Sequence, residues 1–280
     1  MRPASSSARG GEAARPVLAR FALPISGAAV WLAEPTGAED LALAEAADGD
    51  AALALLLAER LGRDPRGGAI GWRALSVGDL DAFVLRLRQA LLGDRIIADL
   101  RCPSCAARFD ISFSVASYLA HHRPRRAAAR PAAEPGWFTL RGTEAAFRLP
   151  TVGDEMDLAG VADGAAELAR RCLGPAASRR RAEAAMAALA PVLAGEIGGP
   201  CAECGASVQV FFDARRYCLT ELQQRACSVF EDIDLLARRY RWSERAILAL
   251  PNRRRATYAD LVRQAGASPV GTSPVGASLA

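Results

Sequence analysis

Two pairs of cysteines constrain the fold of this chain more than any other feature of its sequence. The first pair is Cys102-Pro-Ser-Cys105, and the second is Cys201-Ala-Glu-Cys204. Two thiolates at this spacing span one edge of a metal tetrahedron, so each pair supplies half of a closed four-cysteine site. The pairs are 95 residues apart, whereas an ordinary zinc ribbon separates them by about 15–20. The spacing alone therefore leaves free thiols and two local disulfides open as alternatives.

An internal repeat gives the two cysteine pairs matching positions in the chain. Residues 21–24 and 30–40 recur, with substitutions, as residues 138–141 and 147–157. Each copy predicts two short strands followed by the capped start of a helix. A fixed order of local signals that occurs twice indicates a duplicated structural unit.

Each copy then predicts two more helices. The first helix opens at an Asp-Gly pair and ends at a Leu-Gly pair, whose glycine we expect to cap its C-terminus. The second helix has apolar residues at helical spacing. The predicted spans are 48–61 and 79–92 in the first copy, and 163–173 and 178–193 in the second.

The copies match best around the cysteines. Apolar residues alternate with polar ones from Phe109 to Val115 and again from Val208 to Phe212, and a period of two predicts a strand. A tyrosine, Tyr118 or Tyr217, then opens a helix at the same distance from its cysteine pair. We infer a diverged duplication in which pseudo-two-fold packing brings the two cysteine pairs together.

The sequence therefore predicts a helix-rich α+β fold made of two diverged repeats. Each repeat runs strands, helices, CxxC, strand and helix; the two share one zinc-ribbon-like site of four cysteines, and helices follow at the C-terminus. A closed site of four thiolates is structural rather than catalytic, so we expect one structural zinc ion per chain. Its predicted ligands are Cys102, Cys105, Cys201 and Cys204. The remaining cysteines, Cys172, Cys218 and Cys227, lie on apolar helical faces and are predicted to be small core residues.

Composition shifts divide the chain into six segments. They are a disordered N-terminus (1–16), repeat 1 with the first zinc knuckle (17–122), a linker rich in Pro, Arg and Ala (123–136), repeat 2 with the second knuckle (137–240), a C-terminal helical pair (241–265) and a disordered tail (266–280). Within repeat 2 we predict one long helix over about 214–239, and the last helix should run from Pro251 to Gln264.

No motif in the sequence indicates catalysis. There is no Gly-rich phosphate loop, nucleophile elbow or metalloprotease helix, so we predict that the protein is not an enzyme. His121-His122 has no acidic neighbour in sequence, which favours a solvated pair. The acidic clusters Asp154-Glu155 and Glu231–Asp234 are interpreted as helix-start caps and solvated faces.

Charge does not favour a nucleic acid partner. All 35 basic residues are arginine, the net charge is only +4, and acidic residues are spread throughout. We interpret the arginine runs at 123–126, 179–181, 238–241 and 253–255 as solvated helix faces. The alternative left open is a nucleic-acid-binding regulator that combines the zinc ribbon with a helix-turn-helix over 242–262.

Cellular location follows from the N-terminus and the apolar runs. Residues 1–16 lack the apolar core of a signal peptide, and the longest apolar run, 51–58, is far shorter than the ~20 residues of a membrane-spanning helix. The strong bias to arginine and alanine is typical of a GC-rich bacterial genome. We expect a cytoplasmic bacterial protein, and in a reducing compartment paired cysteines favour a metal over a disulfide.

The second half of the chain resembles a known family. The residues that carry the resemblance are Cys201-Ala-Glu-Cys-Gly205 and the pattern Tyr-x-Trp-Ser-Glu-x-x-Ile-Leu-x-Leu-Pro-x-x-Arg-Arg from Tyr240 to Arg255. They are similar to T4-type phage baseplate proteins of the hub-assembly chaperone class, also encoded in contractile injection-system gene clusters. The similarity is close over 201–262 and loose over 17–265. One departure is that the first knuckle lacks the glycine that follows the second.

The resemblance implies a non-enzymatic assembly factor or minor component of a phage-like contractile baseplate. Its partners would be baseplate hub or other tail-like particle proteins, without a membrane or a small-molecule substrate. The protein would act in the bacterial cytoplasm or be incorporated into the particle. We expect the C-terminal helices to pack on the core or to engage a partner, through Trp242, Ile247, Leu248, Arg253, Arg254 and Tyr258.

Overall fold

The computed structural model describes residues 15–46, 51–125, 129–175 and 177–267 and confirms a helix-rich α+β fold. The elements of the first repeat are β1 (Val17–Ala22), β2 (Ala29–Ala33), α1 (Gly37–Glu45), α2 (Ala51–Leu61), β3 (Gly62–Arg63), the 3-10 helix η1 (Trp72–Ala74), α3 (Val77–Leu92), β4 (Arg95–Arg101), β5 (Arg108–Ser114) and α4 (Val115–His121).

The second repeat has nearly the same order of elements. They are β6 (Ala129–Pro131), β7 (Trp137–Leu140), β8 (Ala146–Arg148), α5 (Val152–Leu158), α6 (Gly164–Cys172), α7 (Arg179–Leu189), β9 (Ala194–Pro200), β10 (Ser207–Asp213) and α8 (Ala214–Ala226). Three helices follow, α9 (Ser228–Tyr240), α10 (Glu244–Leu248) and α11 (Asn252–Ala267).

Equivalent helices begin in the same way in both repeats. Thr36 caps α1 and Thr151 caps α5, and each forms a capping box with the acidic residue three positions later, Glu39 or Asp154. A capping box satisfies two backbone N–H groups that the first helical turn leaves free. The expectation that Asp154 acts at a helix start is therefore confirmed.

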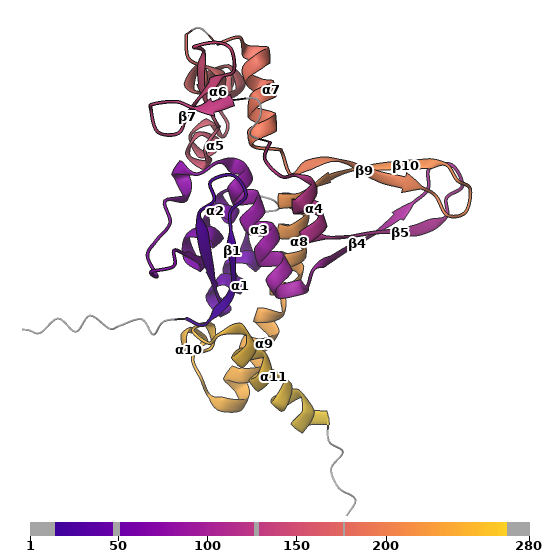
Figure 1. Cartoon of the computed structure of the whole chain (residues 1–280). Helices are drawn as coiled ribbons and strands as arrows, with labels where there is room; N and C mark the ends of the chain where they lie inside the picture. Colours follow the sequence, from indigo (N-terminus) through magenta and orange to yellow (C-terminus); the bar gives the residue numbers. More distant parts are fainter. Residues whose placement is uncertain (1–14, 47–50, 126–128, 176, 268–280) are drawn as a thin grey trace, which may run out of the picture.

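The two cysteine motifs lie at the tips of two antiparallel hairpins, β4–β5 and β9–β10. Every residue from Arg95 to Tyr118 has its counterpart from Ala194 to Tyr217, without insertion or deletion. We call the two hairpins together the arm, since they project side by side from the helical body (Figure 1). The strands β4 and β9 before the cysteines were not predicted, although those after them were.

The main core belongs to the first repeat but includes helices of the second. Trp72 and Phe83 pack edge to face, with ring centroids 4.9 Å apart, among buried leucines of α2 and α3. Val152 of α5 and Leu219 of α8 are fully buried in the same cluster. The repeats are therefore interlocked, because part of the second closes the core of the first.

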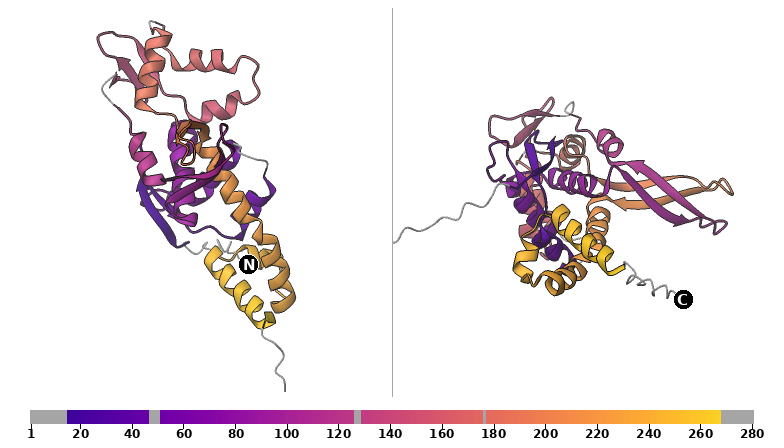
Figure 2. Two further views of the ribbon diagram at one scale, coloured as in Figure 1. Left: turned by 90° about the vertical axis from the view of Figure 1, so that its right-hand side faces the viewer. Right: turned by 90° about the horizontal axis from the view of Figure 1, so that it is seen from below.

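The second repeat has a smaller core of its own. Phe147 of β8 packs there against small residues of α7, including Ala182 and Ala185. This small core, the main core and the C-terminal helices α9–α11 follow one another along the molecule (Figures 1 and 2). The core at this end of the molecule is thus built largely from small side chains.

Two glycines expected to cap helices have another role. Gly62 begins β3, and Gly174 donates its N–H to the carbonyl of Ala146 at 2.9 Å; neither has the positive φ of a C-cap glycine. A Cβ would lie 2.6 Å from the Trp72 ring at Gly62, and 2.9 Å from the Ala146 oxygen at Gly174. The capping prediction was wrong because the chain returns at once to pair with β2 or β8.

Several predicted boundaries also need correction. The expected linker at 123–136 contains β6, which pairs with β7 because its extended Ala-Arg-Pro segment serves as an edge strand. Residues 15 and 16 continue into β1: Arg15 pairs with Glu39, and the Pro16 carbonyl accepts from Glu34. The rest of the predicted N-terminal segment, and the tail from 268, lie outside the described residues.

The helices near the C-terminus differ from prediction in length. The helix expected over 214–239 is two helices, α8 and α9, because the helical hydrogen bonding is interrupted at Cys227. The final helix extends to Ala267, three residues beyond the predicted end. Conversely, α7 ends at Leu189 rather than at residue 193.

Candidate metal centre

The four predicted ligands form one group at the tip of the arm. All four Sγ atoms lie within 4.8 Å of one another. The Sγ atoms of Cys102 and Cys204 are 3.7 Å apart, and those of Cys105 and Cys201 are 3.9 Å apart. A tetrahedral ion with bonds of about 2.3 Å needs sulfur atoms about 3.8 Å apart, so the group is compatible with a single zinc site. The crossed pairing is also what a pseudo-two-fold axis produces.

Equivalent backbone turns hold the two cysteine pairs. The N–H of Cys102 donates to Ala107 and its carbonyl accepts from Ala106, both at 2.9 Å. In the second repeat Cys201 makes the same two bonds, with Ala206 at 2.8 Å and Gly205 at 2.9 Å. Each turn thus points both sulfur atoms of its pair toward the other hairpin.

The two turns differ in residue type at one backbone position that has a positive φ. Gly205 has a φ of 71°, and its counterpart Ala106 has a φ of 60°. For a residue with a Cβ, this left-handed conformation costs about 1–2 kcal/mol. The first turn keeps the conformation without the glycine, which indicates that the surrounding structure imposes it.

Burial is equal on the two sides of the site. Cys102 and Cys201 are buried, whereas Cys105 and Cys204 are exposed. Phe109 and Val208 pack beside the two buried cysteines. Four thiolates from two sides complete a tetrahedron, which leaves no position for a water or substrate and makes such a site structural.

Hydrogen bonding shifts the pKa values of the two thiols of the first pair in opposite directions. The N–H of Cys105 lowers the pKa of the Cys102 thiol to about 6. The pKa of the Cys105 thiol moves to about 12: the N–H of Ala107 lowers it, but hydrogen bonding with Cys204 and burial outweigh that effect. Like charges this close oppose joint ionisation, and a divalent cation removes that repulsion.

Aromatic packing fixes the base of the arm. The equivalent residues Phe113 and Phe212 meet edge to face, with ring centroids 5.2 Å apart, and Tyr118 packs 5.4 Å from Phe212. Tyr217 donates its hydroxyl to the carbonyl of Ile97 in the other hairpin at 3.1 Å. The hairpins are therefore joined at both ends, by aromatic rings at the base and by the cysteines at the tip.

The C-terminal residues predicted to bind a partner divide into two groups. Ile247 is fully buried, so it packs on the chain's own core, and the Cα of Leu248 lies against Gly37 of α1. Arg253 and Arg254 are exposed, and Trp242 and Tyr258 are half-buried. These last four residues remain available at the surface.

Three rings and one arginine form a surface group that we call the aromatic cluster. The ring centroids of Tyr240 and Trp242 are 4.9 Å apart and stacked, and Trp242 meets Tyr258 edge to face at 5.2 Å. The guanidinium of Arg254 lies 5.6 Å from the centroid of the Tyr258 ring. The cluster thus places one exposed and two half-buried aromatic rings where α9 and α11 meet.

A buried ion network lies next to this cluster, and no sequence pattern predicted it. Arg255 is only 3% exposed and pairs with Asp40 of α1 and Asp232 of α9. Arg263 also reaches Asp232, at 2.7 Å. The interpretation of the runs 253–255 and 231–234 as solvated faces was wrong for Arg255 and Asp232, because two carboxylates 192 positions apart in the chain neutralise Arg255 inside the protein. The other charged residues of the two runs are exposed. No local pattern could have paired them.

The remaining cysteines and the histidine pair were predicted with mixed success. Cys172 and Cys218 are buried as predicted, but Cys227 is exposed at the break between α8 and α9. His121 is exposed, and His122 contacts the carbonyl of Tyr118 through Nδ1 at 2.9 Å. Within the described residues, no other group of histidine, cysteine and acidic side chains is placed to bind a metal.

Comparison of the chain with protein-family models, curated proteins and solved structures gives no match. Among the helices of the described residues, none combines the length and the apolar character that crossing a membrane requires. Function must therefore be inferred from the geometry of the arm, the aromatic cluster and the residue pattern around it.

Proposed function

We propose that this protein is a non-enzymatic assembly factor, or a minor component, of a phage-like contractile tail or injection-system baseplate, held together by one structural zinc ion. The observation that carries the proposal is the closed ring of four sulfur atoms contributed equally by two repeats. Such a ring stabilises a shape and leaves no position for chemistry. A rigid shape without a reaction centre fits a protein that positions other proteins.

Zinc is the metal that fits this donor set best. Four thiolates in a tetrahedron suit zinc, and iron is the competing ion. Zinc has no redox chemistry and no geometric preference of its own, so its contribution at this site is to hold two hairpins in register. Metal analysis of the purified protein should find one zinc per chain, whereas iron with a visible absorption band would overturn the assignment.

The partner surface that we infer is the aromatic cluster with its neighbouring arginines. Tyrosine, tryptophan and arginine dominate the binding energy of protein interfaces. Tyr240, Trp242, Tyr258 and Arg254 gather in one surface group, in which Tyr240 and Arg254 are exposed and the other two are half-buried. The pattern that resembles baseplate assembly proteins contributes Tyr240, Trp242 and Arg254. Its other residues have internal roles, such as Ser243 as the cap of α10 and Arg255 in the buried network.

Affinity purification from bacteria that carry this gene together with a contractile-tail gene cluster tests this proposal. We expect a baseplate hub protein to be recovered with the wild-type protein. A Trp242→Ala/Tyr258→Ala double variant should recover at least about tenfold less of that hub protein, which is the effect of one interface hot spot. The matched control is Phe211→Ala on the arm, an aromatic residue that is 69% exposed and should leave recovery unchanged.

Two outcomes would remove the proposal. One is the recovery of no baseplate protein. The other is salt-sensitive binding of duplex DNA, which belongs to the zinc-ribbon and helix-turn-helix regulator. The structure leaves few cations on α11 for phosphate groups, since Arg255 and Arg263 are paired with acidic residues and Arg254 lies over Tyr258.

A further inference from the structure

Three helix pairs in this protein share one architecture. In α2–α3, α6–α7 and α9–α11 a helix is followed by a connection and then by a second helix; the connection holds β3 and η1 between α2 and α3, and α10 between α9 and α11. Ser76, Ser178 and Pro251 lie directly before those second helices. Two of the pairs receive the capped start of another helix, and these two show what the third is built to accept.

The start of α5 docks on the pair α2–α3. Thr151 and Ser76 form an isolated antiparallel bridge, in which the N–H of Val152 donates to Leu75 at 2.9 Å and the N–H of Val77 donates to Pro150 at 3.4 Å. The approach is close: a Cβ on Gly153 would lie 3.0 Å from the carbonyl oxygen of Arg73 in η1.

The start of α1 docks on α9–α11 in the same manner. Thr36 bridges to Pro251, the N–H of Asn252 donates to Pro35 at 2.9 Å, and the N–H of Gly37 donates to Leu250 at 3.3 Å. A Cβ on Gly37 would lie 2.8 Å from the backbone of Leu248 in α10. Both docked helices therefore begin Pro-Thr and carry glycine at the point of contact.

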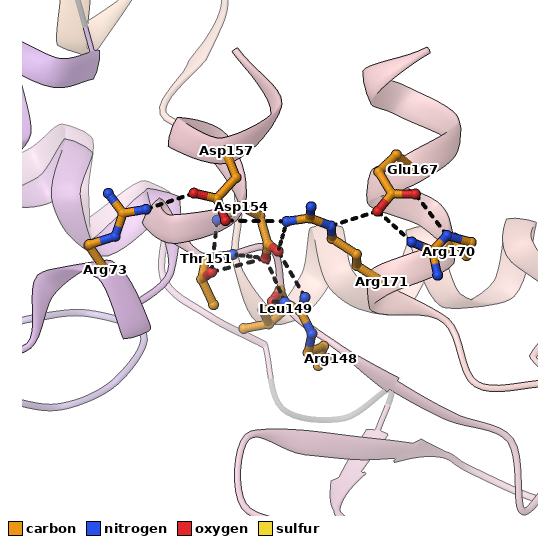
Figure 3. A network of polar contacts seen from close by, with 9 residues as sticks. All are labelled: Arg73, Arg148, Leu149, Thr151, Asp154, Asp157, Glu167, Arg170 and Arg171. Carbon is orange, nitrogen blue, oxygen red and sulfur yellow. Dashed lines mark hydrogen bonds and ion pairs between the residues drawn. The ribbon is translucent and has the colours of Figure 1, made fainter. Parts of the chain in front are cut away.

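Arginines of the receiving side pair with one acidic residue of each docked helix. Arg73 of η1 reaches Asp157 near the end of α5 at 2.7 Å, and Arg255 of α11 pairs with Asp40 in the first turn of α1. The first-turn acid of α5, Asp154, is surrounded by Arg148 and Arg171 of its own repeat, as Figure 3 shows. The receiving side thus combines a backbone bridge, a close backbone approach and an arginine side chain.

The third pair, α6–α7, has a serine directly before its second helix and arginines after it, and no helix start occupies it among the described residues. No bridge forms there at Ser178, whose side chain caps nothing. A pocket of about 350 Å³ opens between the two helices, with Leu168, Met186 and the 66% exposed Val192 on its walls. Arg179, the first residue of α7, lines the pocket and pairs with Glu183 on the same wall, while the next residue, Arg180, is exposed.

We propose that the groove between α6 and α7 binds the start of a helix from another protein. By analogy with α1 and α5, that segment begins Pro-Thr or Pro-Ser, has Asp or Glu three residues after the hydroxyl, and has small and apolar residues in its first turns. A second folded copy of this chain is not the occupant, because its two helix starts of this type, those of α1 and α5, are already docked on its own helices. This surface is separate from the aromatic cluster, so the inference stands apart from the baseplate proposal.

A peptide from the chain itself is a suitable probe. A fluorescent peptide of residues 147–160, with photo-methionine at Met156, contains the whole docking start of α5. Added to the full-length protein, it should bind saturably and cross-link to α6 and α7. A Thr151→Ala peptide should bind about tenfold more weakly, since a helix cap is worth about 1 kcal/mol or slightly more.

Two matched variants of α7 locate the binding site. Ala187 lines the pocket and Ala184 does not, and both are exposed. Ala187→Phe should weaken peptide binding at least tenfold, whereas Ala184→Phe should leave it unchanged. The inference is overturned by absence of saturable binding, by equal effects of the two variants, or by cross-links confined to α2–α3, where the peptide would be replacing the chain's own α5.

Discussion

The two repeats have the same order of elements but differ in how completely they are packed. In the first repeat, Trp72 and Phe83 fill the space beside α2 and α3, and neither side chain is more than 1% exposed. In the second, alanines of α7 face the small core, and a pocket of about 350 Å³ remains between α6 and α7. One copy therefore became a full core and the other kept an open groove.

This difference shows how a duplicated unit can divide its tasks. The cysteine-bearing hairpins remain equivalent residue by residue, because a tetrahedral site demands the same geometry from both sides. The helices of the two repeats are not tied by such a constraint, so their packing could diverge. Four comparisons between equivalent residues test how far this division extends.

The largest effect is expected at the cysteines. Cys102→Ser and Cys201→Ser should each abolish metal binding, because three thiolates do not close the site, and each should remove a binding free energy on the scale of about 10 kcal/mol. Zinc content and thermal unfolding measure this loss. Cys227→Ser, which changes an exposed thiol outside the site, is the control, and zinc retained after either ligand change would show that the site is not shared.

The acid that follows the capping box should matter more in the first repeat. Asp40 is buried and pairs with Arg225 and Arg255, so Asp40→Ala removes one of the two carboxylates that neutralise the buried Arg255 and should cost about 3 kcal/mol in urea unfolding. Its counterpart Glu155 has a side chain that is 30% exposed. When Glu155 is replaced, its partner Arg215 still pairs with Asp81. Glu155→Ala should therefore cost only about 1 kcal/mol, and equal costs would contradict the proposed difference.

The acid at the fifth position of α3 should make stability depend on pH, unlike the one in α7. Burial raises the pKa of Asp81 to about 6, although Arg215 opposes the shift. The folded state then binds more protons than the unfolded state between pH 4 and 6, so this group's contribution to stability falls by up to about 3 kcal/mol as the pH rises through that window.

An Asp81→Asn variant should flatten that part of the stability curve in urea unfolding between pH 4 and 7. Glu183, at the same position of α7, is exposed and pairs with Arg179. Glu183→Gln should leave the shape of the curve unchanged. A wild-type curve that rises between pH 5 and 7 relative to Asp81→Asn would contradict the assignment.

The smallest effect is expected at the cysteine turns. There the residue of one repeat can be introduced at the equivalent position of the other. Ala106→Gly should stabilise the protein by about 1 kcal/mol, because it relieves the left-handed backbone at a φ of 60°. Gly205→Ala should destabilise it by a similar amount through the backbone alone, since a Cβ there meets no atom within 4 Å. Shifts of the same sign in thermal unfolding would show that the two turns are not equivalent.

The sequence allowed the candidate site to be predicted more fully than the fold around it. Cysteine spacing and the alternation after it identified the four clustered cysteines and strands β5 and β10, since both signals are local. Strand β9 was missed because Ala194–Pro200 contains three glycines and a proline, which are depleted in strands. It forms a strand because β10 pairs with it along its whole length.

By itself, the sequence determined the duplication, the capped helix starts and the two halves of a four-cysteine site, because spacing, periodicity and capping act between residues a few positions apart. Only the tertiary structure decided that Arg255 is buried between Asp40 and Asp232, that α5 closes the core of the first repeat, and that α6 and α7 stay apart. These outcomes depend on which distant surfaces meet. Complementary shape and charge across an interface leave no periodic trace along the chain.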